Sequence, residues 1–372
     1  MGRTKQRNHH AKTGRVGALV GTLLIVVAAL CIFLYRDKFA GGTAASQTSA
    51  GNETYTYETG SQQMFSLMGN ELAIASTTGL QLLDGSGKSI LREVFSMTKP
   101  AVCTSDKCCV FYDIGGTAIR VVKSGKSSTI AREAPVTSVS LSSGGYIAVS
   151  GEEDGYKGSV IVYDEALKPI YKWYSGSAYP LDAAVSPEND ELAVLTVGEN
   201  GSEIHLFRLD SEKETSTVKL DGELAFRLHY AKNGDFCVLS EKNLRFYAPG
   251  GKALSTFAFS SGTLDNYAFG TDFTVVALGK YVSGGSTELT SLGPDGKKLG
   301  NMTLSEAPTA LSLQGRKLLV LAGDAATVYD NALRAQKSAE VNSGYLSAAL
   351  LPNGEVLLLS THYAEKCTPK GD

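Results

Sequence analysis

The sequence predicts an all-β protein, a β-propeller of eight blades, preceded by one transmembrane helix. Three observations lead to this prediction. Residues 16–35 form a single uncharged apolar run. From residue 60 onward a strand-rich unit recurs, and no segment there shows the 3.6-residue period of an amphipathic helix. The 40 glycines follow no collagen-like period and supply the many turns that such a chain needs.

The N-terminal segment has the features of a membrane anchor. Residues 1–15 carry five basic side chains and no acidic one, and residues 16–35 then run for 20 positions without a charge. A helix of that length crosses a hydrocarbon core of about 30 Å. By the positive-inside rule the basic tail stays in the cytoplasm and the rest of the chain is exported. The alternatives are a cleaved signal peptide, whose apolar region is usually shorter, and a lipoprotein signal at Cys31, which the bulky Leu30 disfavours.

A short linker follows the helix. Residues 36–52 are rich in Gly, Ser, Thr and Ala. Such a segment buries too little apolar surface to fold and acts as a flexible tether, with an average span of about 20 Å. We therefore expect the domain formed by residues 53–372 to lie close to the outer surface of the membrane.

The repeated unit of that domain begins with a strand, a tight polar turn and a strongly apolar strand. After these come another apolar strand, a glycine-containing turn and a more polar strand. The tight turn and its apolar strand recur at residues 68–76, 105–113, 142–151, 186–198, 232–240, 270–279, 314–323 and 352–360. The first core residues of these strands are 36 to 45 positions apart, close to the period of four-stranded propeller blades.

The two ends of the domain are expected to meet. The last unit, residues 346–367, supplies only about three strands. We expect residues 53–58 to pair with it as the missing outer strand, which would close the ring and remove an exposed sheet edge. Eight blades result. Seven is the alternative, if the unit at 98–133 is irregular.

The repeats resemble known propellers. The stretch SPENDELAVLTVG at 186–198 resembles the hairpin of WD40-like and TolB-like blades, and turns such as that in GLQLLDGSGKSILRE at 79–93 resemble quinoprotein-type blades. The whole layout resembles an uncharacterised family of single-pass membrane proteins from Gram-positive bacteria. The GH…WD pair of true WD40 repeats and the sialidase Asp-box are absent, and Trp173 is the only tryptophan. The resemblance therefore implies a fold and no activity.

Cys103 and Cys108 are candidate disulfide partners. If Ser105 and Asp106 form a two-residue turn, the two cysteines face each other at a non-hydrogen-bonded position, where side chains approach closely. An exported domain permits disulfides. The alternative is two free cysteines. No nearby histidine completes a zinc site, and we predict no metal and no cofactor.

Four aromatic residues are candidates for stacking on the sugar rings of an envelope glycan. They are Tyr171, Trp173, Tyr174 and Tyr179. The alternative, which we favour, is that Tyr171 and Trp173 lie on an outer strand and pack between blades.

No catalytic motif accompanies the repeats. The sequence contains neither a G-x-S-x-G elbow nor an H-E-x-x-H motif, and its net charge of −3 argues against nucleic-acid binding. We predict a non-enzymatic binding or scaffold propeller with a cytoplasmic N-terminus and an extracytoplasmic domain, whose partner is an envelope protein or glycan. The alternatives are a hydrolase or lyase with its site in the propeller channel, and a transmembrane sensor. Carboxylates or histidines converging in the channel would favour the enzyme.

Overall fold

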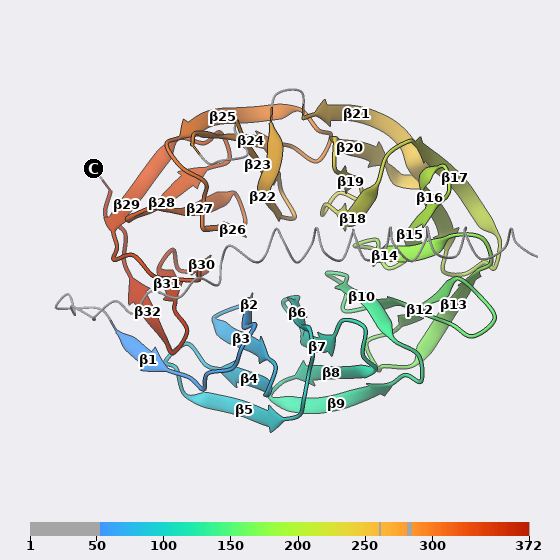
Figure 1. Cartoon of the computed structure of the whole chain (residues 1–372), viewed down its shortest axis with the longest axis horizontal. Coiled ribbons are helices and arrows are strands. Elements are labelled where there is room, and N and C mark those ends of the chain that lie inside the picture. The colour runs from blue at the N-terminus through green and yellow to red at the C-terminus, as the bar shows by residue number, and fades with distance from the viewer. Residues whose placement is uncertain (1–52, 260–261, 281–284, 372) are drawn as a thin grey trace, which may run out of the picture. The chain divides into compact units, whose positions relative to one another are not determined.

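A computed structural model describes residues 53–259, 262–280 and 285–371. These residues form eight four-stranded antiparallel sheets, which follow one another around a central axis (Figure 1). The domain is thus an eight-bladed β-propeller, as predicted, and the unit at 98–133 is a regular blade. The predicted helix at 16–35 and linker at 36–52 lie outside the described residues. Within the described ranges, no helix is long and apolar enough to cross a membrane.

We number the blades 1 to 8 in chain order. Blades 1 and 2 consist of β2 (Met64–Met68), β3 (Glu71–Ser76), β4 (Gly79–Leu83), β5 (Ser89–Val94), β6 (Pro100–Thr104), β7 (Cys109–Asp113), β8 (Ala118–Lys123) and β9 (Lys126–Ala131). Blades 3 and 4 consist of β10 (Val136–Leu141), β11 (Ile147–Gly151), β12 (Gly158–Tyr163), β13 (Pro169–Ser175), β14 (Tyr179–Val185), β15 (Glu191–Gly198), β16 (Gly201–Arg208) and β17 (Glu214–Asp221).

The second half of the ring follows the same plan. Blades 5 and 6 consist of β18 (Ala225–Tyr230), β19 (Phe236–Ser240), β20 (Asn243–Ala248), the short helix η1 (Pro249–Gly251), β21 (Lys252–Ala258), β22 (Thr263–Phe269), β23 (Thr274–Gly279), β24 (Thr287–Leu292) and β25 (Lys298–Leu304). Blades 7 and 8 consist of β26 (Ala310–Gln314), β27 (Lys317–Ala322), β28 (Ala325–Asp330), β29 (Ala335–Glu340), β30 (Ser347–Leu350), β31 (Val356–Leu359), β32 (Tyr363–Cys367) and β1 (Thr54–Thr56).

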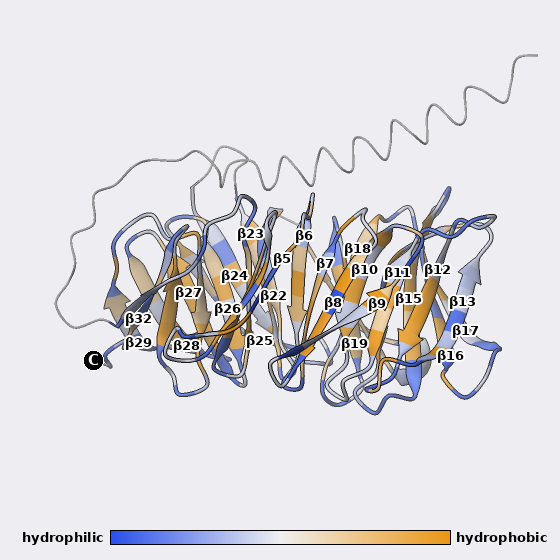
Figure 2. Ribbon diagram, turned by 90° about the horizontal axis from the view of Figure 1, so that it is seen from below, coloured by the Kyte–Doolittle hydropathy of each residue, from blue (hydrophilic) through white to orange (hydrophobic). Residues whose placement is uncertain are grey.

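Each blade has its first strand at the centre of the ring and its fourth at the periphery (Figure 1); in blade 8, β30 is innermost and β1 outermost. The second strands are the most buried, and every residue of β11 and β19 is buried. Neighbouring blades cover both faces of these strands, which explains their continuous apolar runs. Figure 2 shows the result as apolar strands between polar turns. Among the described residues, each contact between adjacent blades has its own apolar cluster.

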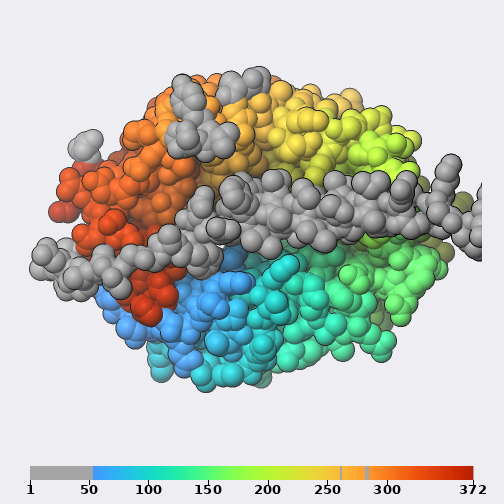
Figure 3. All heavy atoms as spheres, viewed as in Figure 1, coloured from blue at the N-terminus to red at the C-terminus, as the bar shows by residue number. Residues whose placement is uncertain are grey.

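The predicted closure of the ring is confirmed. β1 pairs antiparallel with β32, and Tyr55 lies opposite Ala364. Tyr57 follows β1 and is buried, with its hydroxyl 2.5 Å from the Ser360 carbonyl oxygen and 2.9 Å from that of Tyr363. Figure 3 shows the N-terminal and C-terminal ends of the domain in contact. Blade 8 therefore combines residues from both ends of the domain, and β1 covers the outer edge of β32.

The disc has two faces, defined by its turns. Because strands alternate in direction, the turns between first and second strands share a face with those between third and fourth strands. The chain enters blade 8 on this face, at Glu53, and we therefore call this face the entry face. There the Glu53 carbonyl accepts the Lys366 N–H at 2.9 Å. The other face carries the turns between second and third strands and the connections between blades. We call it the loop face.

The turns between third and fourth strands seal each blade against the one before it. In blade 1 the turn contains Gly87 at φ +83°, where an added Cβ would lie 2.1 Å from a ring carbon of Tyr55 on β1. In blades 3 and 7 the corresponding left-handed residues are Leu167 and Leu333, both at φ 60°. Their side chains instead pack into the apolar clusters between blades 2 and 3 and between blades 6 and 7. The seal is made either by close backbone approach or by an inserted leucine.

Replacing Gly87 with alanine is expected to destabilise the closure of the ring. The variant combines an unfavourable φ with a clash against Tyr55, and we expect the free energy of unfolding to fall by about 2–4 kcal/mol. Gly115 provides the matched control because its φ is +82° and nothing lies near its Cβ position. There we expect a cost of about 1 kcal/mol. Urea denaturation of both variants measures the difference, and equal costs would contradict the role of the Tyr55 contact.

Candidate functional site

The innermost strands surround the central axis of the propeller, and we call the region between them the channel. Their side chains are almost entirely uncharged. Within the eight inner strands as the structure describes them, the charged residues are Asp182, Arg227 and Asp265. Asp265 is occupied within its own blade, where Thr287 Oγ1 donates to its Oδ2 at 3.1 Å. Asp182 and Arg227 are therefore the two charged residues of the inner strands that remain as candidates for a site in the channel.

Backbone irregularities place this pair. The inner strands of blades 3, 4, 5 and 6 each contain a register shift of one residue, and those of the other four blades pair without interruption. Directly after the four shifts come Ser138, Asp182, Arg227 and Asn266. Bulges re-aim side chains and are common beside functional sites. One half of the ring is therefore built differently, and its re-aimed residues are polar.

Asp182 ties blade 4 to blade 5. Its Oδ1 accepts the Ala183 N–H at 3.1 Å, and its Oδ2 accepts the Leu228 N–H of the next inner strand at 3.0 Å. Asn266 does the same in blade 6: it accepts the Tyr267 N–H at 2.9 Å and donates to the Pro308 carbonyl at 3.3 Å. The two side chains are thus equivalent positions of the repeat, each linking its blade to the next.

Arg227 is held less tightly. Its Nε donates to the Tyr267 hydroxyl at 3.4 Å, and its Nη1 lies 4.0 Å from Asp182 Oδ2. Its side chain is 43% exposed, whereas that of Asp182 is 5% exposed. The charge of Arg227 also acts on Cys103 of β6. Cys103 lies in blade 2 and Arg227 in blade 5, so this interaction joins inner strands that are not neighbours in the ring.

The electrostatics of the cluster follow from burial. Burial raises the pKa of Asp182, against the opposing effects of Arg227 and of the backbone N–H of Leu228. For Arg227 burial works to lower the pKa, but Asp182 and the hydroxyls of Tyr267 and Tyr112 outweigh it, so the net pKa is raised. The guanidinium therefore stays charged.

Neither Cys103 nor Asp182 is activated as a nucleophile or a base. Burial raises the pKa of the Cys103 thiol, which suppresses the nucleophilic thiolate. Both carboxylate oxygens of Asp182 already accept backbone N–H groups, so the residue is poorly placed as a general base. No group of metal-binding side chains gathers in the described ranges. The arrangement can bind and orient a ligand.

His229 is a second titratable residue of β18. Its ring stacks on Phe269 at 5.1 Å between centroids, with 5° between the planes, and its Nε2 lies 3.2 Å from the Gly270 carbonyl oxygen. The contact assigns the proton of the neutral ring to Nε2. Burial lowers the pKa of His229 to about 4. His229 is thus a neutral link between blades 5 and 6.

This low pKa predicts a loss of stability in mild acid. The unfolded chain binds a proton on His229 near pH 6.5, whereas the folded protein does so only near pH 4. The free energy of unfolding should therefore have its full value above pH 6.5. It should fall by up to about 3 kcal/mol as the pH drops toward 4. Urea denaturation across this range, with His229→Gln as the test variant and the exposed His362→Gln as the control, measures the effect. An unchanged pH slope in His229→Gln would contradict it.

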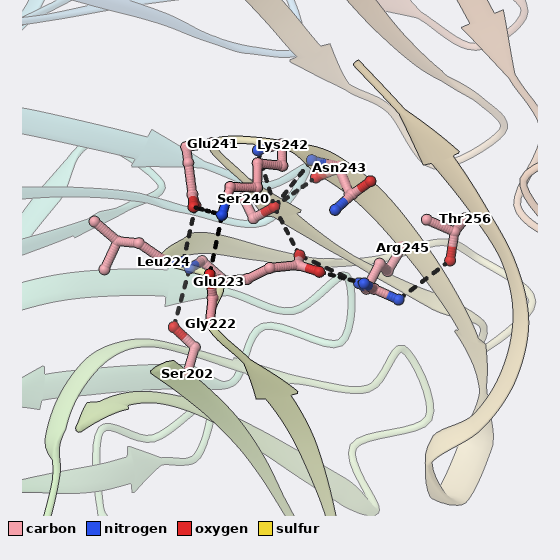
Figure 4. A network of polar contacts seen from close by, with 11 residues as sticks. Ser202, Gly222, Glu223, Leu224, Ser240, Glu241, Lys242, Asn243, Arg245 and Thr256 are labelled. Atoms are coloured by element: carbon pink, nitrogen blue, oxygen red, sulfur yellow. Dashed lines mark hydrogen bonds and ion pairs between the residues drawn. The ribbon is translucent and has the colours of Figure 1, made fainter. Parts of the chain in front are cut away.

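On the loop face, one connection between blades is braced by an ion pair whose carboxylate is buried (Figure 4). Glu223 is 7% exposed and pairs with Arg245 of β20, and Ser240 Oγ donates to its Oε2 at 3.0 Å. These contacts lower the pKa of Glu223 against the opposing effect of burial. Beside it, the Leu224 N–H donates to Glu241 Oε2 at 2.8 Å, and Ser202 Oγ accepts the Ala225 N–H at 3.0 Å. The loop at 221–225 is therefore held rigidly between blades 4 and 5.

An acidic cleft adjoins this braced loop. Its volume is about 370 Å³, and it lies at the turn between β15 and β16. It is lined by Ser177, Ala178, Gly198, Glu199, Asn200, Gly201, Ser202, Glu203 and Asp221. Glu203 lies 3.9 Å from Lys219 Nζ and 3.7 Å from His205 Nε2. Glu199 and Asp221 are exposed and have no basic partner among the described residues. The cleft thus presents two uncompensated carboxylates to solvent.

The predicted register of the cysteine hairpin is wrong. Thr104 pairs with Cys109 and Cys103 pairs with Val110, so the two-residue turn is Asp106-Lys107. The Ser105 N–H donates to the Cys108 carbonyl at 2.9 Å. Ser105, which was predicted to lie in the turn, therefore pairs with Cys108 instead. Cys103 and Cys108 therefore do not face each other, and both are free thiols in the structure.

The four predicted aromatic residues separate into two groups. Tyr171 and Trp173 of β13 pack against Phe207 of blade 4, with ring centroids 6.0 and 5.6 Å away, as the packing alternative expected. Tyr174 is 43% exposed and lies 4.7 Å from the exposed ring of Tyr156. Lys157 Nζ lies over the ring of Tyr179, 5.0 Å from its centroid. The structure does not gather the four residues into one stacking surface.

Sequence reasoning missed Asp182 and Arg227. A usable signal was present, because each is a charged residue inside an apolar inner strand, in PLDAAV at 180–185 and in AFRLHY at 225–230. A charge in a strand that blades cover on both sides must be paired or face a channel. The register shifts that aim these side chains leave no such mark in the sequence.

Comparison with known proteins supports the fold. The model of a family described as "Family of unknown function (DUF5711)" matches residues 46–344. No curated protein matches the chain. The C-terminal WD40 domain of Sif2 superposes with a TM-score of 0.60 at 14% identity, covering 88% of this chain and 100% of that domain. BamB from Moraxella catarrhalis gives a TM-score of 0.52 at 11% identity, with 87% and 99% coverage. At these identities the similarity shows the propeller fold alone.

Proposed function

Because the chain belongs to the DUF5711 family of unknown function, we propose its role from its own structure: a membrane-tethered, extracytoplasmic β-propeller that binds a partner at the cell envelope. The observation that carries this proposal is the rigid acidic cleft on the loop face of a closed disc. The Glu223–Arg245 pair fixes one of its walls, so that partner binding need not order the loop. Loops held on a stable scaffold are common binding surfaces.

The charge of the cleft suggests what kind of partner binds there. The uncompensated carboxylates of Glu199 and Asp221 favour basic side chains of an envelope protein over a neutral glycan. Such complementarity mainly raises the rate of association and the selectivity, and it weakens with salt. A partner protein with exposed lysines or arginines therefore fits the cleft best.

The tethering that we propose rests on the sequence. The five basic residues of 1–15 and the apolar run of 16–35 fit a signal anchor with a cytoplasmic N-terminus. The layout is similar to that of single-pass membrane proteins of Gram-positive bacteria. A membrane-impermeant thiol reagent tests the topology in intact cells. We expect it to label a cysteine introduced at Ser46 in the linker, and to label one introduced at Thr13 only after the cells are lysed. The reverse pattern would overturn the orientation.

A site-specific photo-cross-linker tests partner binding in the full-length membrane protein. At Asn200, on the rim of the cleft, we expect a discrete adduct that weakens with salt. At the exposed Asn233, in an entry-face turn, we expect none. The variant Glu199→Gln/Asp221→Asn should remove the adduct at Asn200 and leave membrane insertion unchanged. Absence of an adduct from both positions in the parent protein would count against a binding role for this face.

A further inference from the structure

We propose that the channel binds a carboxylate-bearing group, held by the guanidinium of Arg227. This site is distinct from the acidic cleft and adds a second ligand to the role proposed above. A ligand in the channel could bind whether or not a protein docks on the loop face. Its support comes from three features of Arg227: its position, its incomplete neutralisation by Asp182 and the contacts that direct its side chain.

The position of Arg227 is singular within the ring. It is the only lysine or arginine of the eight inner strands as the structure describes them. Its side chain is 43% exposed, and its charge acts on Cys103 of blade 2, which is not adjacent to blade 5. A guanidinium at such a place meets any anion that enters, in surroundings where water competes less than at an open surface.

The counter-charge of Arg227 is incomplete. The 4.0 Å separation between its Nη1 and Asp182 Oδ2 is too long for a hydrogen bond, and both Asp182 oxygens already accept backbone N–H groups. The two Nη atoms make no hydrogen bond to any residue within the described ranges. These donors form the flat edge that binds a carboxylate through two parallel hydrogen bonds.

Two features of the surroundings direct that edge. Tyr267 accepts a hydrogen bond from Nε, the third donor group of the guanidinium, and the register shift before Arg227 sets the direction of the side chain. Preorganisation of this kind lowers the entropy lost on binding. The nearby negative charge of Asp182 also limits the ligand. A single guanidinium beside a carboxylate suits one negative charge, so a monoanionic carboxylate fits better than a phosphate dianion.

Thermal unfolding of the full chain in detergent tests the proposal. Sodium acetate replaces sodium chloride at constant ionic strength, and inorganic phosphate is tested in parallel. We expect acetate to raise the unfolding midpoint of the parent protein in a saturable way, and phosphate to do so less. In Arg227→Gln, loss of the charge-assisted bonds should weaken acetate binding by about ten- to a hundredfold. Arg227→Lys, which keeps the charge and loses the flat edge, should be intermediate.

The exposed Arg316, in the turn between β26 and β27, supplies the control. Arg316→Gln should respond to acetate as the parent protein does. An equal response in Arg227→Gln and the parent protein, or an equal loss in Arg316→Gln, would overturn the proposal. A dependence on Arg227 for phosphate alone would replace the carboxylate with a phosphate group. Cross-linking at Asn200 reports on the cleft independently, so failure of this test and failure of the proposed docking role are distinguishable.

Discussion

Deleting residues 53–58 should prevent the propeller from closing. Without β1, blade 8 keeps three strands, β32 becomes an exposed edge, and the buried ring of Tyr57 leaves the cluster between blades 8 and 1. We expect the variant to aggregate or to lose the cooperative unfolding transition, because an open edge pairs with other chains. Size-exclusion chromatography and urea denaturation of the full-length variant in detergent measure both effects.

Two finer substitutions separate the contributions of Tyr57. Tyr57→Ala should lower the free energy of unfolding by about 3–5 kcal/mol, the usual cost of removing a buried aromatic ring. Tyr57→Phe should cost only about 1–2 kcal/mol, because it removes the hydroxyl that lies against the Ser360 and Tyr363 carbonyls and leaves the packing. Equal effects would mean that packing of the ring contributes little.

Relocating the strand provides a rescue. Residues 53–62 are removed from their position and appended after Asp372, so that the four strands of blade 8 become consecutive. The connection from Cys367 to Thr54 is then short, and forming it requires Lys370 to leave its bridge to Ser338 of β29. We expect the relocated strand to restore a monomeric protein with a cooperative transition. A relocated variant as unstable as the deletion would show that the N-terminal connection itself is required.

Asp182→Ala is expected to be the most damaging single substitution in the inner strands. It leaves the N–H groups of Ala183 and Leu228 without an acceptor and removes the nearest negative charge from Arg227. We expect the free energy of unfolding to fall by about 3–5 kcal/mol. Asp182→Asn should also destabilise the protein, because an amide offers one acceptor oxygen where two N–H donors need one each.

Asn266 provides the matched control for Asp182. It occupies the same position in blade 6 and also links its blade to the next, but it carries no charge. Asn266→Ala should cost about 1–2 kcal/mol, and the excess cost of Asp182→Ala then reflects the stranded charge of Arg227. Chemical denaturation of both variants gives the comparison. If the two costs are equal, the Asp182–Arg227 pair contributes little to stability.

The sequence was sufficient for the architecture because the relevant signals are local and repeated. The polar turn before each apolar strand marks every blade, and burial on both faces accounts for runs such as Val160–Val162. The closing strand could be predicted because the last unit lacked a partner for its outer edge, and an unpaired edge is unfavourable.

The details of the site depend on single-residue shifts, which the sequence does not mark. At the cysteine hairpin, both Ser105-Asp106 and Asp106-Lys107 are acceptable turn residues, and the hydrogen bond between Ser105 and Cys108 decides between them. In β18, a shift of one residue between Ala225 and Arg227 directs the arginine toward the channel. Because side chains alternate along a strand, such a shift reverses which face a residue occupies.

The pairing of β1 with β32 also sets an order of events during synthesis. Tyr57 and its acceptor Tyr363 are 306 positions apart, so the first of the described strands to leave the ribosome is among the last to find its place. Seven blades can assemble from neighbouring sequence while the chain is still growing, whereas the eighth waits for the C-terminal residues. A truncated translation product would therefore retain a free N-terminal strand and an open ring. Chaperones and proteases could recognise the product by either feature.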